Sequence, residues 1–300
     1  MQNYIVAIPL DRNVAEFIGK KGSENSITFY NRTYGDSTIV SLMPTSIEEK
    51  PYALAESLLL ANQVVLSTSS IDKNFGEALV AASLAGKKII FTNENDVKGM
   101  LKGTGINDYI IATKEELLDK IIANKNDESL SSSRLTRIDV DKSFDVRGIG
   151  TVVLGIVTSG VVNVHDTLFG ADGKSVSVRS IQSQDRDIES APLYTRVGLA
   201  LKGAESDSIS KGDILSSEQI TKVSNARASI KISEVGKEEV LPGNVYGFAS
   251  NFSFTNATVV NAFENEVELK FEKSLQLSRG DRFMLTRQKL PRIFASGTIL

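Results

Sequence analysis

The segment from Ser143 to Gly160 restricts the fold of this chain more than any other part of its sequence. It reads as two β-strands that meet at a bend marked by Gly148 and Gly150, and Gly155 interrupts the β-branched run that follows. Glycines in this arrangement suit a sharp strand bend or bulge in a small closed barrel. The chain differs in character on the two sides of this segment. Because 300 residues also exceed one ordinary core, we expect two or three domains.

The residues before this segment alternate between continuous apolar runs and helical patterns. Gln63–Ser67 and Lys87–Thr92 are apolar runs typical of buried strands. The helical pattern Asn74–Ala85 lies between them, and Gly86 follows it, where helices commonly end at glycine. This alternation predicts βαβ units and a parallel sheet over residues 1–125. The other expected elements are strands at Asn3–Ile8, Thr38–Met43 and Asp108–Ala112, helices at Asp11–Lys21, Pro51–Asn62 and Glu115–Ala123, and a loop at Gly22–Asn25.

A polar, serine-rich stretch at residues 126–134 reads as an interdomain linker. Short strands alternate with turns beyond it, without a helical pattern of any length, which predicts all-β structure. The predicted fold class is therefore multidomain, with an α/β parallel-sheet domain followed by two antiparallel β-barrels at residues 135–219 and 220–300. The expected strands are Arg137–Val140, Gly150–Thr158, Gly160–Val164, Lys174–Ile181, Arg196–Leu201 and Gly212–Leu215 in the first barrel, and Ala226–Ser233, Asn244–Ala249, Ala257–Ala262, Glu266–Phe271, Arg282–Thr286 and Ile293–Ile299 in the second.

Composition excludes several classes of protein. The chain has no cysteine and one histidine, His165, so thiolate metal sites, a cysteine nucleophile and a His-based metal centre are excluded, and His165 is interpreted as a turn residue. No apolar run reaches the roughly 18 residues that span a bilayer, and the N-terminus lacks the pattern of a secretory signal. We expect a cytoplasmic protein with neither a membrane nor DNA as partner.

The net charge of −3 is unevenly distributed. Residues 1–130 carry 13 Lys and Arg against 17 Asp and Glu, a net charge of −4, and residues 131–300 carry 21 against 20, a net charge of +1. A polyanion-binding face is therefore expected in the second half of the chain. The alternative is that these are ordinary solvated charges.

Several segments resemble the translation elongation factors related to elongation factor Tu. The segment Phe144–Val162 resembles the opening of the second domain in that family. Val176–Pro192, Thr195–Gly203 and Ile209–Leu215 resemble the selenocysteine-specific branch in particular, so this part of the resemblance covers about 80 residues. Gly19–Asn31 is similar to a segment of the SelB-like factors of archaea that use pyrrolysine. Arg282–Leu285 and Arg292–Gly297 look like the end of the third domain.

The resemblance implies a protein that is, or once was, switched by GTP and that binds aminoacyl-tRNA. The second domain of such factors holds the aminoacylated 3′ end of tRNA, and the third lies along the acceptor and T stems. Selenocysteine-specific factors carry a fourth domain that reads an mRNA hairpin. Since this chain ends at Leu300, we do not expect it to recognise that hairpin.

The phosphate-binding motifs of a GTPase are missing from the expected positions. A phosphate loop needs Gly-x-x-x-x-Gly-Lys-Ser/Thr between the first strand and helix, because backbone N–H groups and the lysine hold the phosphates. Here Ala7–Ala15 has no glycine, Pro9 has no N–H to donate, and Asp11 adds a negative charge. Gly19-Lys20-Lys21 is a superficial match at the far end of the expected helix. The Asp-x-x-Gly of the family is replaced by Pro44-Thr-Ser-Ile after the second strand.

The guanine-binding motif Asn-Lys-x-Asp is represented by Asn93-Glu94-Asn95-Asp96, after the strand Lys87–Thr92. Asn93 and Asp96 are the candidates for a degenerate nucleotide site, although Glu94 lacks the stem with which lysine packs on the base. Asn124–Asp127 fits the motif literally but follows a helix, so this match is interpreted as coincidental. We therefore expect a pseudo-GTPase with no catalytic residue, in which neither GTP nor Mg²⁺ is a cofactor.

Arginine and glutamine residues in the barrels are the candidates for tRNA contacts, because RNA is held through its phosphates and its unpaired bases. For each of them the alternative is an ordinary barrel-surface or corner residue. Gly148, Gly150 and Gly198 are interpreted as structural. The candidates are Arg147, Arg179, Gln182 and Arg196 in the first barrel, and Arg282, Arg287 and Arg292 in the second.

Three functions agree with these patterns. The leading hypothesis is a translation-factor paralogue that binds tRNA or the ribosome without hydrolysing GTP. The second is a scaffold that binds a protein of the translation apparatus, and the acidic first domain favours a protein partner there. The third is a residual GTP-binding elongation factor. Because the groups that would sense a γ-phosphate are missing, we also expect a fixed arrangement of the first domain and the barrels.

Overall fold

The computed structural model describes residues 2–124 and 135–300 of the chain. The chain divides into two units. The first combines residues 1–125 with residues 225–272 and 279–300, and the second contains residues 126–224 and 273–278. The α/β part and the C-terminal barrel thus belong to one unit. The expected linker at residues 126–134 lies outside the described residues.

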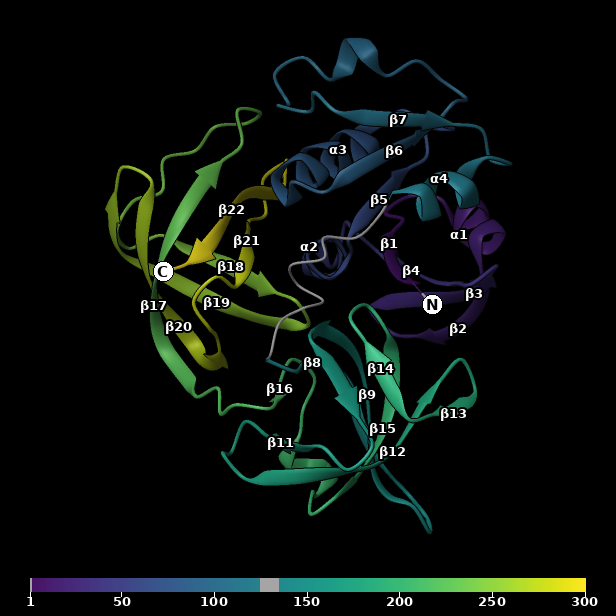
Figure 1. Cartoon of the computed structure of the whole chain (residues 1–300). Coiled ribbons are helices and arrows are strands. Elements are labelled where there is room, and N and C mark those ends of the chain that lie inside the picture. Colours follow the sequence, from purple (N-terminus) through teal and green to yellow (C-terminus); the bar gives the residue numbers. More distant parts are fainter. Residues whose placement is uncertain (1, 125–134) are drawn as a thin grey trace. The chain divides into compact units, whose positions relative to one another are not determined.

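A seven-stranded sheet forms the core of the α/β part, in the order β2-β3-β4-β1-β5-β6-β7 (Figure 1). Its five parallel strands confirm the predicted parallel sheet, and an antiparallel hairpin extends it at one edge. The parallel strands are β1 (Gln2–Ala7), β4 (Ser37–Pro44), β5 (Gln63–Leu66), β6 (Lys88–Thr92) and β7 (Tyr109–Ala112), and the hairpin strands are β2 (Lys20–Glu24) and β3 (Ile27–Tyr34).

The hairpin corrects two predictions from the sequence. The expected helix Asp11–Lys21 ends at Ile18, and the expected loop at Gly22–Asn25 is largely strand β2. Every side chain of β2 is exposed, so this edge strand shows no apolar periodicity. The approach of the two strands requires Gly19, because a Cβ there would lie 2.9 Å from the backbone nitrogen of Asn31.

Four helices cover the two faces of this sheet. Val14 and Ile18 of α1 and Leu117 of α4 share a core with Tyr4 and Val6, alternate residues of β1. Helices α2 and α3 contact each other and the strands β1, β4 and β5. Gly86 follows α3 with φ of 58°, which confirms the predicted C-terminal glycine. The helices are α1 (Arg12–Ile18), α2 (Pro51–Leu60), α3 (Lys73–Ala85) and α4 (Leu117–Ala123), with a 3₁₀ turn, η1, at Lys98–Met100.

The C-terminal barrel is closed, in the order β17-β20-β19-β18-β21-β22. Phe248 packs in its core against Phe271 and Phe283 at 4.8 Å between ring centroids. Gly297 is required where β22 crosses this core, since a Cβ would come within 2.3 Å of the Phe283 ring. The strands are β17 (Lys222–Ile232), β18 (Val245–Ser250), β19 (Ser253–Phe263), β20 (Glu266–Gln276), β21 (Arg282–Thr286) and β22 (Ile293–Ile299).

The other barrel lies in the second unit, with its strands in the order β11-β16-β8-β9-β15-β12-β13. Strand β11 pairs with both β16 and β12, which closes a ring of six strands. A separate ribbon joins β10 to β14. The strands are β8 (Arg137–Val146), β9 (Gly150–Ser159), β10 (Val161–Asn163), β11 (Thr167–Phe169), β12 (Ser175–Ser183), β13 (Arg186–Ile188), β14 (Ser190–Pro192), β15 (Arg196–Lys202) and β16 (Ile214–Ser216), with a 3₁₀ turn, η2, at Ser206–Ser208.

The glycine-marked segment forms the hairpin β8–β9 of this barrel, as predicted. Gly148 and Gly150 have φ of 82° and 94° in its turn. Gly155 permits close strand approach, because a Cβ there would lie 2.5 Å from the carbonyl oxygen of Asp139. Strand β8 is longer than the expected Arg137–Val140, and its register shifts after Val140. Three short strands, β11, β13 and β14, were not predicted.

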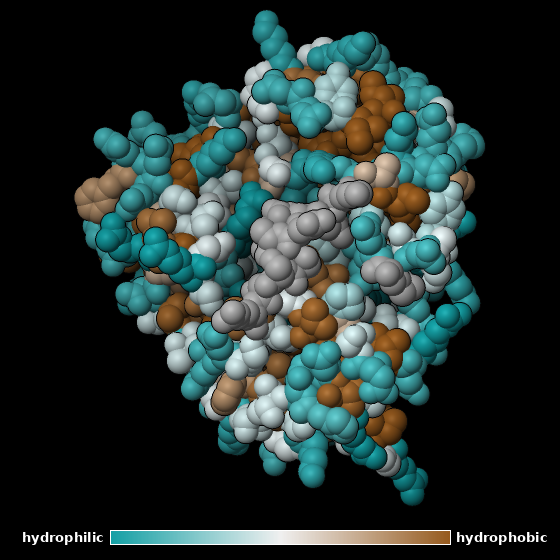
Figure 2. Space-filling view, viewed as in Figure 1, coloured by the Kyte–Doolittle hydropathy of each residue, from teal (hydrophilic) through white to brown (hydrophobic). Residues whose placement is uncertain are grey.

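The described residues contain no helix long and apolar enough to cross a membrane. On the face shown in Figure 2, hydrophobic residues form small areas between polar ones, and one such area lies over the edge of the sheet near β7. Ile111 of β7 is 46% exposed.

Candidate functional site

The carboxyl end of β1 is where a doubly wound α/β domain places its phosphate-binding turn. Four residues, Ile8 to Asp11, join β1 to α1, and Pro9 among them is buried and has no N–H group. Asp11 Oδ1 accepts hydrogen bonds from the backbone nitrogens of Asn13 at 2.8 Å and Val14 at 3.1 Å. The positive end of α1 therefore already faces a carboxylate that belongs to the chain.

The second oxygen of this carboxylate is also occupied. Asp11 Oδ2 accepts hydrogen bonds from Ser67 Oγ at 2.6 Å and Ser69 Oγ at 3.0 Å, in the loop after β5. Burial raises the pKa of the Asp11 carboxyl, but these hydroxyls and the two backbone N–H groups outweigh burial and hold it below its ordinary value. An ionised side chain thus takes the donors that a phosphate would need.

A cavity of about 300 Å³ opens beside this turn, after the end of β4. Pro9, Thr45, Glu48, Glu49 and Asn74 are among the residues that line it. Glu48 forms an ion pair with Lys73 at 3.0 Å, and Glu49 is exposed. These carboxylates would repel a polyphosphate.

The two candidate nucleotide-binding residues, Asn93 and Asp96, are exposed in the loop after β6. Asp96 Oδ1 accepts a hydrogen bond from the backbone nitrogen of Lys98 at 3.0 Å, at the start of η1. The residues between them are tied to the end of β5, since Asn95 Nδ2 donates to the carbonyl oxygen of Thr68 at 2.6 Å and Thr68 Oγ1 donates to Glu94 at 3.0 Å. The loop is thus held by its own hydrogen bonds at the position of a guanine site.

Three of the tRNA-binding candidates are exposed on the barrel of the second unit. Arg147 lies in the β8–β9 turn, and Arg179 of β12 donates through Nη1 to the carbonyl oxygen of Ile149 in the same turn, at 3.1 Å. The structure therefore brings Arg147 and Arg179 to one end of the hairpin. Gln182 lies farther along β12 and donates to Asp187 at 2.8 Å.

The fourth candidate in this barrel, Arg196, is largely buried. Its side chain is 13% exposed and lies 3.9 Å from Asp141 of β8. Burial lowers the pKa of Arg196 to about 10 and raises the pKa of Asp141. The arrangement is that of a partly buried ion pair inside the unit.

The three candidates near the C-terminus contact distant parts of the first unit. The backbone nitrogen of Arg292 donates to Glu77 of α3 at 2.8 Å, and its guanidinium pairs with the same carboxylate. Arg282 Nη2 donates to the carbonyl oxygen of Leu84 at 3.3 Å. Arg287 pairs with Glu238 and lies over the Phe294 ring at 4.7 Å. The basic C-terminal stretch therefore joins parts of one unit, and its partners lie too far away in sequence to be predicted.

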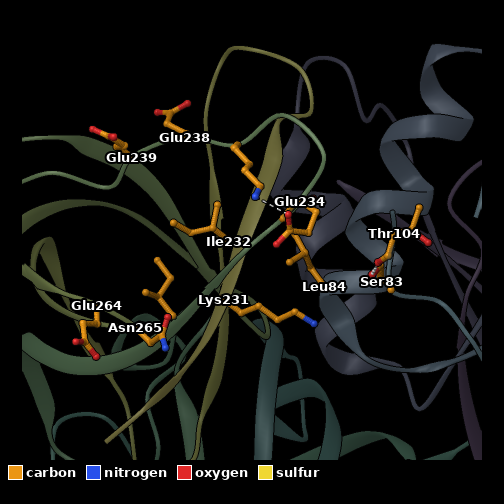
Figure 3. Close-up of a pocket in the computed structure, with 14 residues that line it drawn as sticks. Ser83, Leu84, Thr104, Lys231, Ile232, Glu234, Glu238, Glu239, Glu264 and Asn265 are labelled. Atoms are coloured by element: carbon orange, nitrogen blue, oxygen red, sulfur yellow. Dashed lines mark hydrogen bonds and ion pairs between the residues drawn. The ribbon is translucent and has the colours of Figure 1, made fainter. Parts of the chain in front are cut away.

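A groove of about 840 Å³ lies between the end of α3 and the barrel (Figure 3). Its lining includes Lys231 of β17 and four carboxylates. Glu234 pairs with Lys237 at 2.6 Å and Glu238 with Arg287. The sequence patterns give no indication of this groove. The carboxylates that line it are Glu234, Glu238, Glu239 and Glu264.

No cluster of three or more His, Cys, Asp or Glu side chains in residues 2–124 and 135–300 is arranged to hold a metal ion.

Comparison with known proteins identifies relatives among translation factors. An uncharacterized protein of Methanocaldococcus jannaschii is 29% identical over 282 residues, which cover 91% of each chain. The selenocysteine-specific elongation factor of that organism is 29% identical over 178 residues, covering 52% of this chain and 38% of the factor. The corresponding factor of Haemophilus influenzae is 23% identical over 310 residues, covering 98% and 48%. The chain thus spans less than half the length of these selenocysteine-specific factors.

No protein-family model matches the chain. The crystal structure of elongation factor SelB from Methanococcus maripaludis, bound to a GTP analogue, superimposes with a TM-score of 0.84 at 19% identity, and the match covers 100% of this chain and 79% of SelB. A bacterial selenocysteine-specific elongation factor gives a TM-score of 0.81 at 16% identity, covering 99% and 58%. In sequence the chain is similar to selenocysteine-specific elongation factors, and its fold is that of SelB.

Proposed function

We propose that this chain is an elongation factor-like pseudo-GTPase that binds tRNA without GTP or Mg²⁺. The carboxylate of Asp11 carries the proposal. It accepts hydrogen bonds from two backbone N–H groups at the start of α1 and from the hydroxyls of Ser67 and Ser69. A triphosphate placed there would displace these bonds and meet a fixed negative charge in a partly buried position.

The other two nucleotide elements support the same proposal. The end of β4 and the loop after it contain Pro44 and Thr45 in place of the acid and glycine that would face Mg²⁺ and a γ-phosphate. The Thr45 hydroxyl donates instead to the carbonyl oxygen of Ser26. Glu94, at the guanine position, accepts a hydrogen bond from Thr68. These contacts within the chain support the proposed loss of nucleotide binding.

Titration with fluorescent GTP and GDP analogues in the presence of Mg²⁺ tests the loss of nucleotide binding. We expect no saturable binding up to millimolar nucleotide, with an active selenocysteine-specific factor as the positive control. A dissociation constant in the micromolar range or tighter would show that the chain is a residual GTP-binding factor instead.

We propose the surface of Arg147, Arg179 and Gln182 as the tRNA-binding face. Arg147 lies in the β8–β9 turn and Arg179 of β12 bonds to the same turn, and neither arginine has an ion pair among the described residues. Guanidinium groups that have no ion-pair partner in the chain are available to bind the phosphates of an RNA backbone. Arg287 and Arg292 are proposed as structural residues, because each one pairs with a glutamate within the first unit.

A mobility-shift assay with charged and uncharged tRNA over a salt series tests this face. Affinity should fall steeply as salt rises, and the double variant Arg147→Ala/Arg179→Ala should bind at least about tenfold more weakly and show a shallower salt slope. Arg227→Ala is a matched control, since Arg227 is exposed on the other barrel and pairs with Glu266 at 2.8 Å. Equal losses of tRNA affinity in the double variant and in Arg227→Ala would show that this face is not the tRNA-binding face.

A second candidate function is a scaffold for another protein of the translation apparatus, and the groove beside α3 favours it. Glu239 and Glu264 line the groove and have no ion-pair partner among the described residues, so the groove suits a basic segment of a protein. Two results together would support this function. The chain would give no mobility shift with tRNA at low salt. It would bind a lysine-rich peptide, and Glu239→Gln/Glu264→Gln would abolish that binding whereas the control Glu272→Gln would preserve it.

A further inference from the structure

Lys87 is a half-buried lysine that no carboxylate neutralises. It follows Gly86 at the end of α3 and precedes β6. In the described part of the chain, its ammonium group makes no hydrogen bond and no ion pair. A partly buried charge without a partner is costly, so the absence of a counter-charge requires an explanation.

Arg282 brings a second cation to the same corner. Its Nη2 lies 3.6 Å from the position that a Cβ on Gly86 would occupy. The guanidinium donates to the carbonyl oxygen of Leu84 at 3.3 Å, and no ion pair to it is present among the described residues. The carbonyl groups at the end of α3 supply only a partial negative charge.

The electrostatics of the two side chains agree with this geometry. Burial lowers the pKa of Lys87 to about 8, with a further contribution from the charge of Arg282, and burial also lowers the pKa of Arg282. The buried carboxylate of Glu77 on α3 is already occupied, because both of its oxygens accept hydrogen bonds from Arg292.

We propose that Lys87 and Arg282 form a binding site for a phosphate-type oxyanion. The lysine supplies a compact charge and the guanidinium a planar set of N–H donors, a combination that suits the tetrahedral oxygens of a phosphate. The site is separate from the degenerate nucleotide site, since Lys87 precedes β6 whereas Asn93 and Asp96 follow it. The oxyanion is either a free phosphate ester or a phosphate of an RNA backbone.

Thermal unfolding in phosphate and in chloride, at equal ionic strength, tests the site. Inorganic phosphate at tens of millimolar should raise the Tm of the wild-type chain by about 2–4 °C more than that of Lys87→Met. Lys88→Met is the matched control, because Lys88 is the next residue and is exposed; it should respond to phosphate as the wild type does. Equal responses of the wild type and Lys87→Met would overturn the proposal.

Binding of a short RNA duplex distinguishes the two sources of the oxyanion. If Lys87→Met loses both the phosphate response and about threefold or more of its affinity for the duplex, the ligand is an RNA backbone. If it loses only the phosphate response, the ligand is a free phosphate ester. Arg282 is left unchanged in these variants because it also bonds to Leu84.

Discussion

At the residue scale, the carboxylate of Asp11 has four donors around it, two from α1 and two from the loop after β5. The sequence predicts that Pro9 and Asp11 are incompatible with a phosphate loop, and this stays a prediction. The sequence was not sufficient to predict the hydroxyls of Ser67 and Ser69, which lie 56 and 58 residues away. The structure thus adds a physical role for Asp11, as an internal anion at the start of a helix.

Replacing Asp11 with alanine should lower the free energy of unfolding by about 1–2 kcal/mol, the usual cost of losing an N-terminal cap. Because its pKa is lower in the folded state, this stabilisation is complete above the unfolded-state pKa and is lost as the pH falls through the folded-state value. Urea unfolding of the wild type and Asp11→Ala, repeated from pH 7 to pH 3, should therefore show a difference that shrinks below about pH 4. A difference in the free energy of unfolding that stays constant with pH would contradict the role of Asp11 as an internal anion. An equal difference in the exposed control Asp108→Ala would also contradict it.

At the element scale, the elements with long periodic patterns, such as α3 and β22, were predicted almost to the residue, whereas the hairpin strands β2 and β3 and the short strands β11, β13 and β14 were missed. Burial produces the periodicity that a sequence shows, so an edge strand without buried side chains leaves no pattern. The contacts of α3 show that prediction from the sequence was also limited for the candidate site. Arg292 is a tRNA-binding candidate from its sequence neighbourhood, and the sequence contains no sign that it bonds to Glu77, 215 residues away.

The pair of Glu77 and Arg292 should be coupled in a double-mutant cycle. Glu77→Ala should cost about 2–4 kcal/mol, because it leaves a partly buried guanidinium unpaired, and Arg292→Ala should recover part of that loss. Chemical unfolding of the two single variants and the double variant measures the coupling. The exposed pair Arg12 and Glu16 is the control, with an expected coupling near 0.5 kcal/mol or less. Additive losses at Glu77 and Arg292 would show that the two side chains do not stabilise the unit together.

Two glycines test the packing of the elements directly. Gly155→Ala should destabilise the barrel of the second unit by about 1–3 kcal/mol, because the new Cβ would lie 2.5 Å from the carbonyl oxygen of Asp139. Gly76→Ala, within α3, should instead stabilise the chain by about 0.5–1 kcal/mol, since no atom lies within 4 Å of the new Cβ. Thermal unfolding measures both effects on stability. Changes in Tm of the same sign in the two variants would contradict the packing described.

At the scale of the whole molecule, the layout of one α/β part and two β-barrels was predicted from the change in pattern near residue 130, and the comparisons agree with it. The sequence did not predict that the α/β part and the C-terminal barrel form one unit. That unit depends on contacts between side chains distant in sequence, among them Tyr52 and Phe254, whose rings stack at 4.7 Å between centroids. Under the proposed function, bonds within the first unit take the place of nucleotide contacts, so we expect ligand binding by this protein to be independent of nucleotide.

The affinity for tRNA, measured in the same buffer with GTP and Mg²⁺, with GDP and Mg²⁺, and with neither, tests this account most directly. We predict one dissociation constant, equal within error in all three conditions, and the loss of that binding in Arg147→Ala/Arg179→Ala. An affinity that rises tenfold or more with GTP over GDP would mean that a functional nucleotide switch survives, and it would contradict the account.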